Sequence, residues 1–112
     1  MIDSAVEEAR QAVAELWPRF RPTIMARLGV LAQAMAALAE QRLSPALRLK
    51  AEQEAHKLAG SLGTFGFAEG TALARAIEMH FRTDAPLTTT EVADLWEKVN
   101  ALQSELEKPP GI

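Results

Sequence analysis

One histidine stands out in the sequence because of the residues around it. His56 lies in the segment from Ala55 to Phe67, which contains three glycines, Gly60, Gly63 and Gly66. On a helix, which turns by about 100° per residue, one face of this region gathers a core stripe of Leu47, Ala51, Ala55, Leu58, Leu62 and Phe65. The opposite face gathers Leu49, Gln53, His56, Gly60 and Gly63. The spacing therefore predicts an imidazole that points away from the core.

The glycines beside this histidine need an explanation. A glycine inside a helix costs about 0.5–1 kcal/mol relative to alanine, and Gly60 falls well inside the expected helix. An exposed helix face gains no packing from the loss of side chains, but it gains access. We therefore expect a partner to approach the face formed by Leu49, Gln53, Gly60 and Gly63, with Lys50 and Lys57 along one flank of the histidine.

The chemistry that suits such a histidine is nucleophilic attack on phosphorus. An exposed imidazole is largely uncharged near neutral pH, so a ring nitrogen keeps the lone pair that forms a phosphoramidate bond. Phosphoryl transfer depends on positioning and charge neutralisation, and Lys57 is the candidate for part of that neutralisation. A partner must supply the rest, because the chain has no glycine-rich phosphate loop, no nucleotide-binding element and no evident magnesium or other metal site.

Five helices are expected to position these residues. The first covers residues 4–16 and starts with a capping-box pattern, in which Ser4 and Glu7 satisfy each other's backbone amides. Pro18 and Pro22 separate it from the second helix, residues 22–41. The third covers residues 45–62, the fourth 68–82, and the fifth runs from a second capping box at Thr88 to about residue 107. The aromatic residues Trp17, Phe65, Phe67, Phe81 and Trp96 are expected in or at the edge of the core.

The predicted fold class is all-α. Helices of this length joined by short loops pack as antiparallel neighbours, so the second to fifth helices form an up-down four-helix bundle. The additional N-terminal helix is expected to cover one end of it. We expect a single domain over residues 1–108, with residues 109–112 as a tail or the start of a linker.

Composition narrows the function classes. The 112 residues include no cysteine, which excludes disulfides and thiolate chemistry. A net charge of −3 argues against nucleic acid as a partner. Arg27, Gln33 and Glu40 interrupt the apolar stretches, and the acidic N-terminus lacks the basic start of a signal peptide. These features favour a cytoplasmic protein without membrane contact.

The segment around the histidine resembles the signature of histidine-containing phosphotransfer (HPt) domains of two-component phosphorelays. That signature is a histidine, an apolar residue two positions later, glycines four and ten positions later, and a following helix with an aliphatic–glutamate pair. The matching residues are His56, Leu58, Gly60, Gly66, and Ile77 with Glu78. With the helix pattern included, the resemblance covers about two-thirds of the chain. One departure is Ala59, where many family members carry a lysine.

The resemblance implies a phosphocarrier without kinase activity of its own. Its histidine exchanges a phosphoryl group with an aspartate on the receiver domain of a response regulator or hybrid histidine kinase. The receiver supplies the magnesium ion, so no cofactor is expected in this chain, which we expect to be a monomer. Lys57 is the candidate to replace the lysine missing at Ala59.

Other interpretations of the sequence remain open. The main alternative is a helical protein-interaction module that has lost phosphotransfer. A haem protein with His56 or His80 as axial ligand is more remote, and His80 is expected to be structural because no second ligand lies at suitable spacing. Glu52 and Glu54 are expected to form a solvated face.

Overall fold

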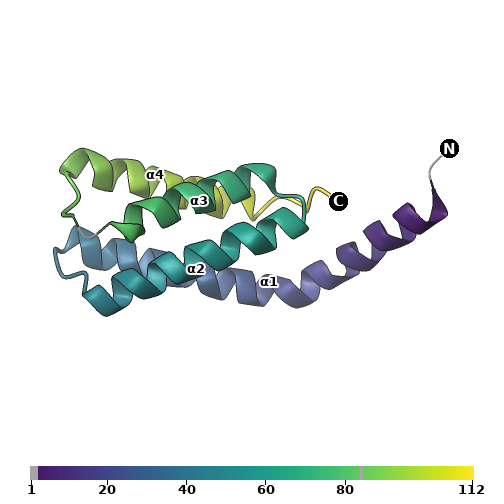
Figure 1. Cartoon of the computed structure of the whole chain (residues 1–112), viewed down its shortest axis with the longest axis horizontal. Coiled ribbons are helices and arrows are strands. Elements are labelled where there is room, and N and C mark those ends of the chain that lie inside the picture. The colour runs from purple at the N-terminus through teal and green to yellow at the C-terminus, as the bar shows by residue number, and fades with distance from the viewer. Residues whose placement is uncertain (1–2, 84) are drawn as a thin grey trace.

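The structure is a computed structural model that describes residues 3–83 and 85–112. Within those residues it contains four helices: α1 (Ser4–Ala39), α2 (Pro45–Thr64), α3 (Ala68–Arg82) and α4 (Thr89–Glu105). Figure 1 shows the four helices packed side by side in alternating directions, and no strand accompanies them in the described part of the chain. The predicted all-α, up-down bundle is confirmed.

The prediction of a separate N-terminal helix is wrong. The two segments expected as residues 4–16 and 22–41 form the single helix α1, which contains both Pro18 and Pro22. A proline inside a helix removes a hydrogen bond and typically costs about 3 kcal/mol. The aromatic ring of Trp17 offsets this cost, because it is buried with its centroid 5.0 Å from the rings of Phe65 and of Phe67. Burial next to the prolines thus supports a helix that the prolines alone would end.

The start of α1 also differs from the prediction. The N-cap is Asp3, whose side chain accepts a hydrogen bond from the Ala5 amide at 3.0 Å. Ser4 is the first helical residue, so the predicted capping box of Ser4 and Glu7 does not form. The N-terminal part of α1 then extends beyond the other helices, as Figure 1 shows. It leaves Val6 and Leu16 about half exposed.

The length of α1 bears on the expectation that the protein has no membrane contact. By length and composition the helix could span a membrane, since its most apolar 18-residue window has a mean hydropathy of 1.3. The sequence-based expectation of interrupted apolar stretches did not anticipate this, because it ended the helix at the prolines. Ile24, Leu31 and Met35 of this helix are fully buried in the bundle, so this part of α1 also supplies the core.

The core runs along the whole bundle. Each helix contributes an apolar stripe; the largest fully buried side chains are Ile24, Leu31, Met35, Leu58, Leu62, Ile77, Phe81, Leu95, Leu102 and Leu106. The expected core positions of Trp17, Phe65, Phe67 and Phe81 are confirmed. Trp96 is the exception: it is 38% exposed, because it follows the buried Leu95 by one residue and so points away from the same stripe.

Helix α2 carries the histidine and has well-defined ends. Ser44 is its N-cap and accepts a hydrogen bond from the Leu47 amide, with Pro45 in the first turn, so the helix begins at the predicted residue. Beyond its end, Gly66 has φ +76°, a left-handed conformation that favours glycine. A Cβ atom at Gly66 would lie 2.6 Å from the backbone of Gly111, whose amide donates to the Phe65 carbonyl at 3.1 Å. Residues 109–112 thus return to this turn.

Helices α2 and α3 are antiparallel neighbours with a regular register. Glu52 pairs with Arg82, and one turn further along α2 His56 pairs with Glu78. At the end of α2, a Cβ atom at Gly63 would be 3.7 Å from the Thr71 hydroxyl. A step of one turn forward on α2 therefore corresponds to one turn backward on α3. This register places the site between the two helices.

Candidate functional site

His56 lies in the middle of α2 on its outer face. Its side chain is 76% exposed, while Ala55 and Leu58 beside it are fully buried. The predicted orientation of the helix is therefore confirmed: the core stripe faces the bundle and the imidazole faces away from it. Gly60, one turn later, is also exposed, and a Cβ atom there would meet nothing within 4 Å.

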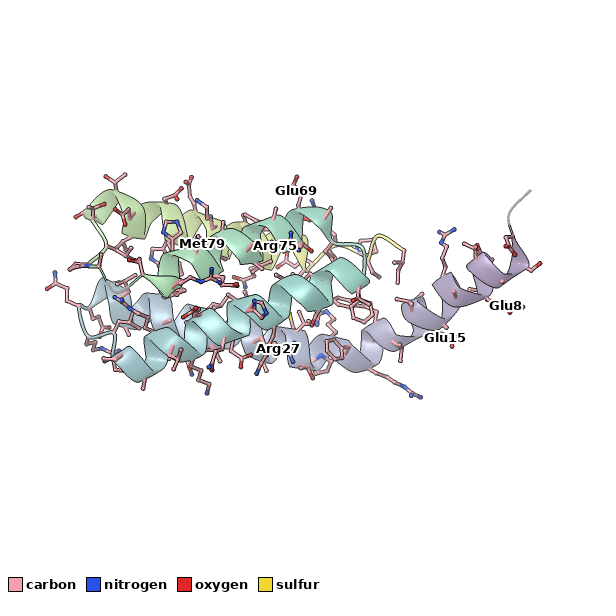
Figure 2. The ribbon with its side chains drawn as sticks, viewed as in Figure 1. Glu8, Glu15, Arg27, Glu69, Arg75 and Met79 are labelled. Carbon is pink, nitrogen blue, oxygen red and sulfur yellow. The ribbon has the colours of Figure 1, made fainter. Side chains whose placement is uncertain are left out.

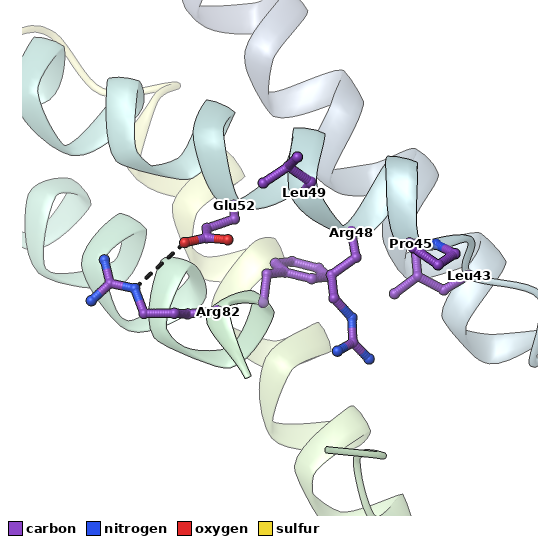
Figure 3. Close-up of a pocket in the computed structure, with 7 residues that line it drawn as sticks. Leu43, Pro45, Arg48, Leu49, Glu52 and Arg82 are labelled. Atoms are coloured by element: carbon purple, nitrogen blue, oxygen red, sulfur yellow. Dashed lines mark ion pairs between the residues drawn. The ribbon is translucent and has the colours of Figure 1, made fainter. Parts of the chain in front are cut away.

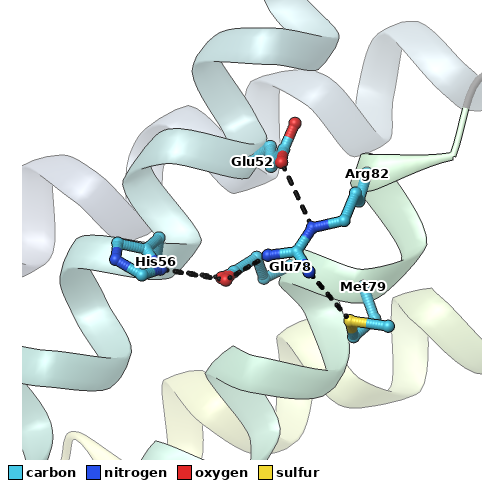
Figure 4. Close-up of polar contacts among 5 residues, drawn as sticks. All are labelled: Glu52, His56, Glu78, Met79 and Arg82. Atoms are coloured by element: carbon cyan, nitrogen blue, oxygen red, sulfur yellow. Dashed lines mark hydrogen bonds and ion pairs between the residues drawn. The ribbon is translucent and has the colours of Figure 1, made fainter.

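The histidine has one carboxylate partner. Nδ1 of His56 lies 3.0 Å from both Oε1 and Oε2 of Glu78 on α3, a contact shown in Figure 4. The Glu78 side chain is only 9% exposed, which makes it the buried charged residue among the described core residues. A buried carboxylate needs partners that replace its lost hydration, and the imidazole is one of them.

Arg82 is the second partner of Glu78. Its Nη2 atom donates to Oε1 of Glu78 at 3.2 Å, and its Nε atom lies 3.5 Å from Oε1 of Glu52 on α2. Nη1 of the same guanidinium lies 3.7 Å from the sulfur atom of Met79. Figure 4 shows these contacts as one connected chain from His56 through Glu78 and Arg82 to Glu52. The network fixes the position of the carboxylate that holds the imidazole.

This geometry determines which ring nitrogen is free to react. An ionised carboxylate only accepts hydrogen bonds, so Nδ1 of His56 must carry the proton that it donates to Glu78. In the neutral ring Nε2 is then unprotonated and has a lone pair. The ring is exposed, so Nε2 is the nitrogen offered to a partner.

Two shallow depressions flank the histidine. The first, of about 450 Å³, is lined by Leu49, Glu52, Gln53, His56, Lys57, Glu78 and Arg82. The second, of about 340 Å³, is lined by His56, Ala59, Gly60, Arg75, Glu78, Met79 and Arg82. Among the predicted partner-binding residues, Leu49 and Gln53 thus lie beside the histidine in the first depression and Gly60 in the second. Lys50 and Gly63 are exposed on α2 but line neither.

A third depression continues the first towards the start of α2. It has a volume of about 340 Å³ and shares Leu49, Glu52 and Arg82 with the first. Figure 3 shows these three residues in the lining of the third depression. Phe81 forms part of its lining. Leu49 is 52% exposed between the two, so an apolar side chain stands on the approach to His56.

Lys57, which was predicted to neutralise part of the phosphate charge, already contacts a carboxylate. Nζ of Lys57 lies 3.6 Å from Oε1 of Glu54, and Oε2 of Glu54 lies 3.5 Å from Nε of Arg27. The Glu54 side chain is 16% exposed and that of Glu52 26% exposed, so the expectation of a solvated acidic face is wrong. Each acid is instead half-buried between helices, where a cation from a neighbouring helix compensates its charge.

Sequence reasoning missed the contribution of α3. The aliphatic–glutamate pair includes Glu78, but the predicted site residues include neither it nor Arg82 or Met79. The available signal was an acidic residue next to Ile77 in a helix whose apolar stripe points inward. Met79 is 59% exposed and lines the second depression together with Arg75. Figure 2 shows both residues on α3.

The second histidine is part of a separate contact. Nε2 of His80 lies 3.5 Å from Oδ2 of Asp94 on α4, and its side chain is 23% exposed. In the described residues no group of three or more His, Cys, Asp or Glu side chains is arranged to hold a metal ion. His80 thus links α3 to α4.

Comparisons with known proteins show the family of the chain. The family model for the Hpt domain matches residues 15–108. Protein RcaC of Microchaete diplosiphon is 31% identical over 93 residues, which cover 83% of this chain and 14% of RcaC. The chain therefore spans about one-seventh of the length of that relative. No solved structure was found to match. Domains of this family act in histidine phosphotransfer with receiver domains, as phosphocarriers without intrinsic kinase activity. On the match over most of its length, the chain belongs to the Hpt domain family.

Proposed function

We propose that His56 accepts a phosphoryl group on Nε2 from an aspartyl phosphate of a receiver domain and returns it to a receiver aspartate. The receiver belongs to a response regulator or a hybrid histidine kinase. The single observation that carries this proposal is the pairing of an exposed imidazole with a buried carboxylate through Nδ1. In the neutral ring this pairing leaves Nε2 without a proton, and the exposure of the side chain makes Nε2 accessible.

The transfer step follows from that pairing. The Nε2 lone pair attacks phosphorus in line, the bond between phosphorus and the aspartate oxygen breaks, and the aspartate leaves as a carboxylate. Bond formation makes the imidazole ring positive while Nδ1 keeps its proton. The Glu78 carboxylate, 3.0 Å away, stabilises that charge, much as a buried aspartate stabilises the imidazolium of a catalytic triad. The reverse reaction uses the same contacts.

The exposed apolar residues on both sides of His56 support a docking surface. Leu49 on α2 and Met79 on α3 are each more than half exposed, and the depressions that they line meet at the histidine. Small transient interfaces of signalling proteins often bury less than about 1,200 Å². We propose that the receiver contacts Leu49, Gln53, Gly60 and Met79, with Lys50, Lys57 and Gly63 at the rim.

The remaining expectations belong to the same proposal. The receiver supplies the magnesium ion that transfer needs. We infer that the domain acts as a monomer in the cytoplasm. Its net charge of −3 argues against nucleic acid as a partner.

Phosphotransfer with a purified receiver domain tests the proposal. The receiver is phosphorylated with acetyl phosphate and magnesium, freed of donor and mixed with the domain. We expect acid-labile, base-stable phosphate on His56, with ¹⁵N-coupled phosphorus NMR assigning the bond to Nε2. His56→Gln should take up no label, whereas His80→Gln serves as the matched control and should be labelled normally.

Other outcomes would redirect the interpretation. Label that persists in His56→Gln would place the site elsewhere. An unlabelled wild-type domain that still binds several receivers would favour a helical interaction module. A bond to Nδ1 would contradict the proposed role of Glu78.

A further inference from the structure

The charges around His56 are almost all matched by partners. The carboxylates near the histidine are those of Glu52, Glu54 and Glu78, and each has a cation within 3.6 Å. Arg82 forms ion pairs with Glu52 and Glu78, while Lys57 and Arg27 form ion pairs with Glu54. These cations already have partners before any phosphate arrives.

Arg75 differs from these cations. It is exposed on α3, and it lines the same depression as His56 and Gly60. Across residues 3–83 and 85–112, its guanidinium makes no hydrogen bond or ion pair with another side chain. It is thus a positive charge beside the reactive histidine that no carboxylate of the described chain compensates.

The register of α2 and α3 gives Arg75 room to reach the histidine. Glu52 faces Arg82 and His56 faces Glu78, so one further turn places Ala59 opposite Arg75. Ala59 is buried and short, and nothing lies within 4 Å of the position that a Cβ atom would take at Gly60. Neither Ala59 nor Gly60 therefore has a side chain that projects far from α2. A long side chain from α3 can lie over this part of the helix.

The positive charge of Arg75 would attract the phosphoryl group of a phosphorylated histidine. A phosphoryl group brings close to two negative charges and three acceptor oxygens. An arginine guanidinium matches phosphate oxygens with a fork of N–H donors and forms short, charge-assisted hydrogen bonds. We propose that Arg75 binds the phosphoryl oxygens of phosphorylated His56 and so stabilises the phosphorylated domain. This inference rests on the proposed function.

A small phosphodonor separates this role from receiver docking. The intact domain is incubated with potassium phosphoramidate, which phosphorylates histidine without a partner, and labelling of His56 is followed by phosphorus NMR. We expect Arg75→Gln to slow labelling about tenfold, the effect of losing one charge-assisted hydrogen bond, and to shorten the half-life of the phosphohistidine. Arg75→Lys should retain part of the effect, because it keeps the charge but not the fork.

The control is Arg21→Gln, which makes the same charge change at an exposed arginine of α1 that lines neither depression. It should behave like wild type, and circular dichroism should show all variants folded. Equal labelling of Arg75→Gln and wild type would overturn the role of Arg75 while leaving phosphotransfer intact. A defect seen with a receiver but absent with phosphoramidate would likewise overturn it, because Arg75 would then contact the partner. A wild-type domain unlabelled by every donor would remove the proposed function, and this inference with it.

Discussion

Nδ1 of His56 lies 3.0 Å from both carboxylate oxygens of Glu78, although the two residues are 22 positions apart in the chain. The contact joins an exposed side chain of α2 to a buried charge on α3. It holds the ring in one tautomer and one orientation, and it depends on the packing of the two helices. Glu78 is therefore a positioning residue for the proposed phosphotransfer.

Replacement of Glu78 should change the tautomer of His56. In Glu78→Gln the carboxylate charge is lost, and we expect the share of rings with the proton on Nδ1 to fall, as measured by ¹⁵N NMR. Phosphotransfer from a receiver should slow roughly 10-fold to 100-fold, the size of effect found when a metal-binding histidine loses the carboxylate that orients it. Glu52→Gln is the matched control, because it removes an acid that contacts Arg82 but not the ring. An unchanged tautomer with a slower rate would contradict this explanation.

Gly60 should be dispensable for folding. A Cβ atom at Gly60 meets nothing within 4 Å, so Gly60→Ala should stabilise the domain by about 0.5–1 kcal/mol in denaturant unfolding. Gly60→Gln should also fold but slow transfer from a receiver, since its side chain projects beside His56. Gly29→Ala, at another open helical position, controls for the effect of helix propensity alone. Unfolding of Gly60→Gln would show that the surface at Gly60 is not free.

Leu49 should affect partner binding more than stability. It is 52% exposed, so Leu49→Asp removes little buried apolar surface, and the unfolding temperature should change by no more than a few degrees. Receiver affinity and transfer rate should fall together, because a charge would occupy the apolar approach to His56. Leu16→Asp makes the same change at a leucine that is 51% exposed on α1 and should leave transfer intact. Normal transfer in Leu49→Asp would place the docking surface elsewhere.

Stability in acid should depend on Asp94. The hydrogen bond from Lys98, with a smaller contribution from His80, lowers the pKa of Asp94 below its usual value of 3.8. A carboxyl whose pKa is lowered by folding contributes stability above its unfolded pKa and loses it as the pH falls through the folded value. Urea unfolding between pH 6 and about pH 2 should therefore show a smaller acid-induced loss in Asp94→Asn than in wild type. Equal pH dependence would exclude this pair as a contributor.

Local patterns in the sequence predicted much of the fold. The apolar stripe of α2 follows helical periodicity, and Ser44 with Pro45 defines its start, so both could be predicted without the other helices. The exposure of His56 followed from the same stripe. The continuity of α1 could not be predicted in this way, because the local cost of Pro18 and Pro22 is offset by contacts of Trp17 with residues almost fifty positions later.

The candidate site was predicted only on the α2 side. Gly60 and Leu49 share a helix face with His56, so their spacing placed them beside it. Glu78 and Arg82 reach the histidine through the register between two helices, which no single helix pattern contains. The pairing of Glu54 with Arg27 was missed for the same reason, since it joins α2 to α1.

The two prolines of α1 have a mechanical consequence. Pro18 and Pro22 are four residues apart, so they lie one above the other on the same side of the helix. Neither has an N–H group, which leaves the carbonyl oxygens of Ala14 and Pro18 without a helical donor, and both rings are exposed. Bending resistance is therefore weakest along one direction. We expect the part of α1 that is N-terminal to Trp17 to bend mainly in one plane, while the part packed in the bundle keeps its direction.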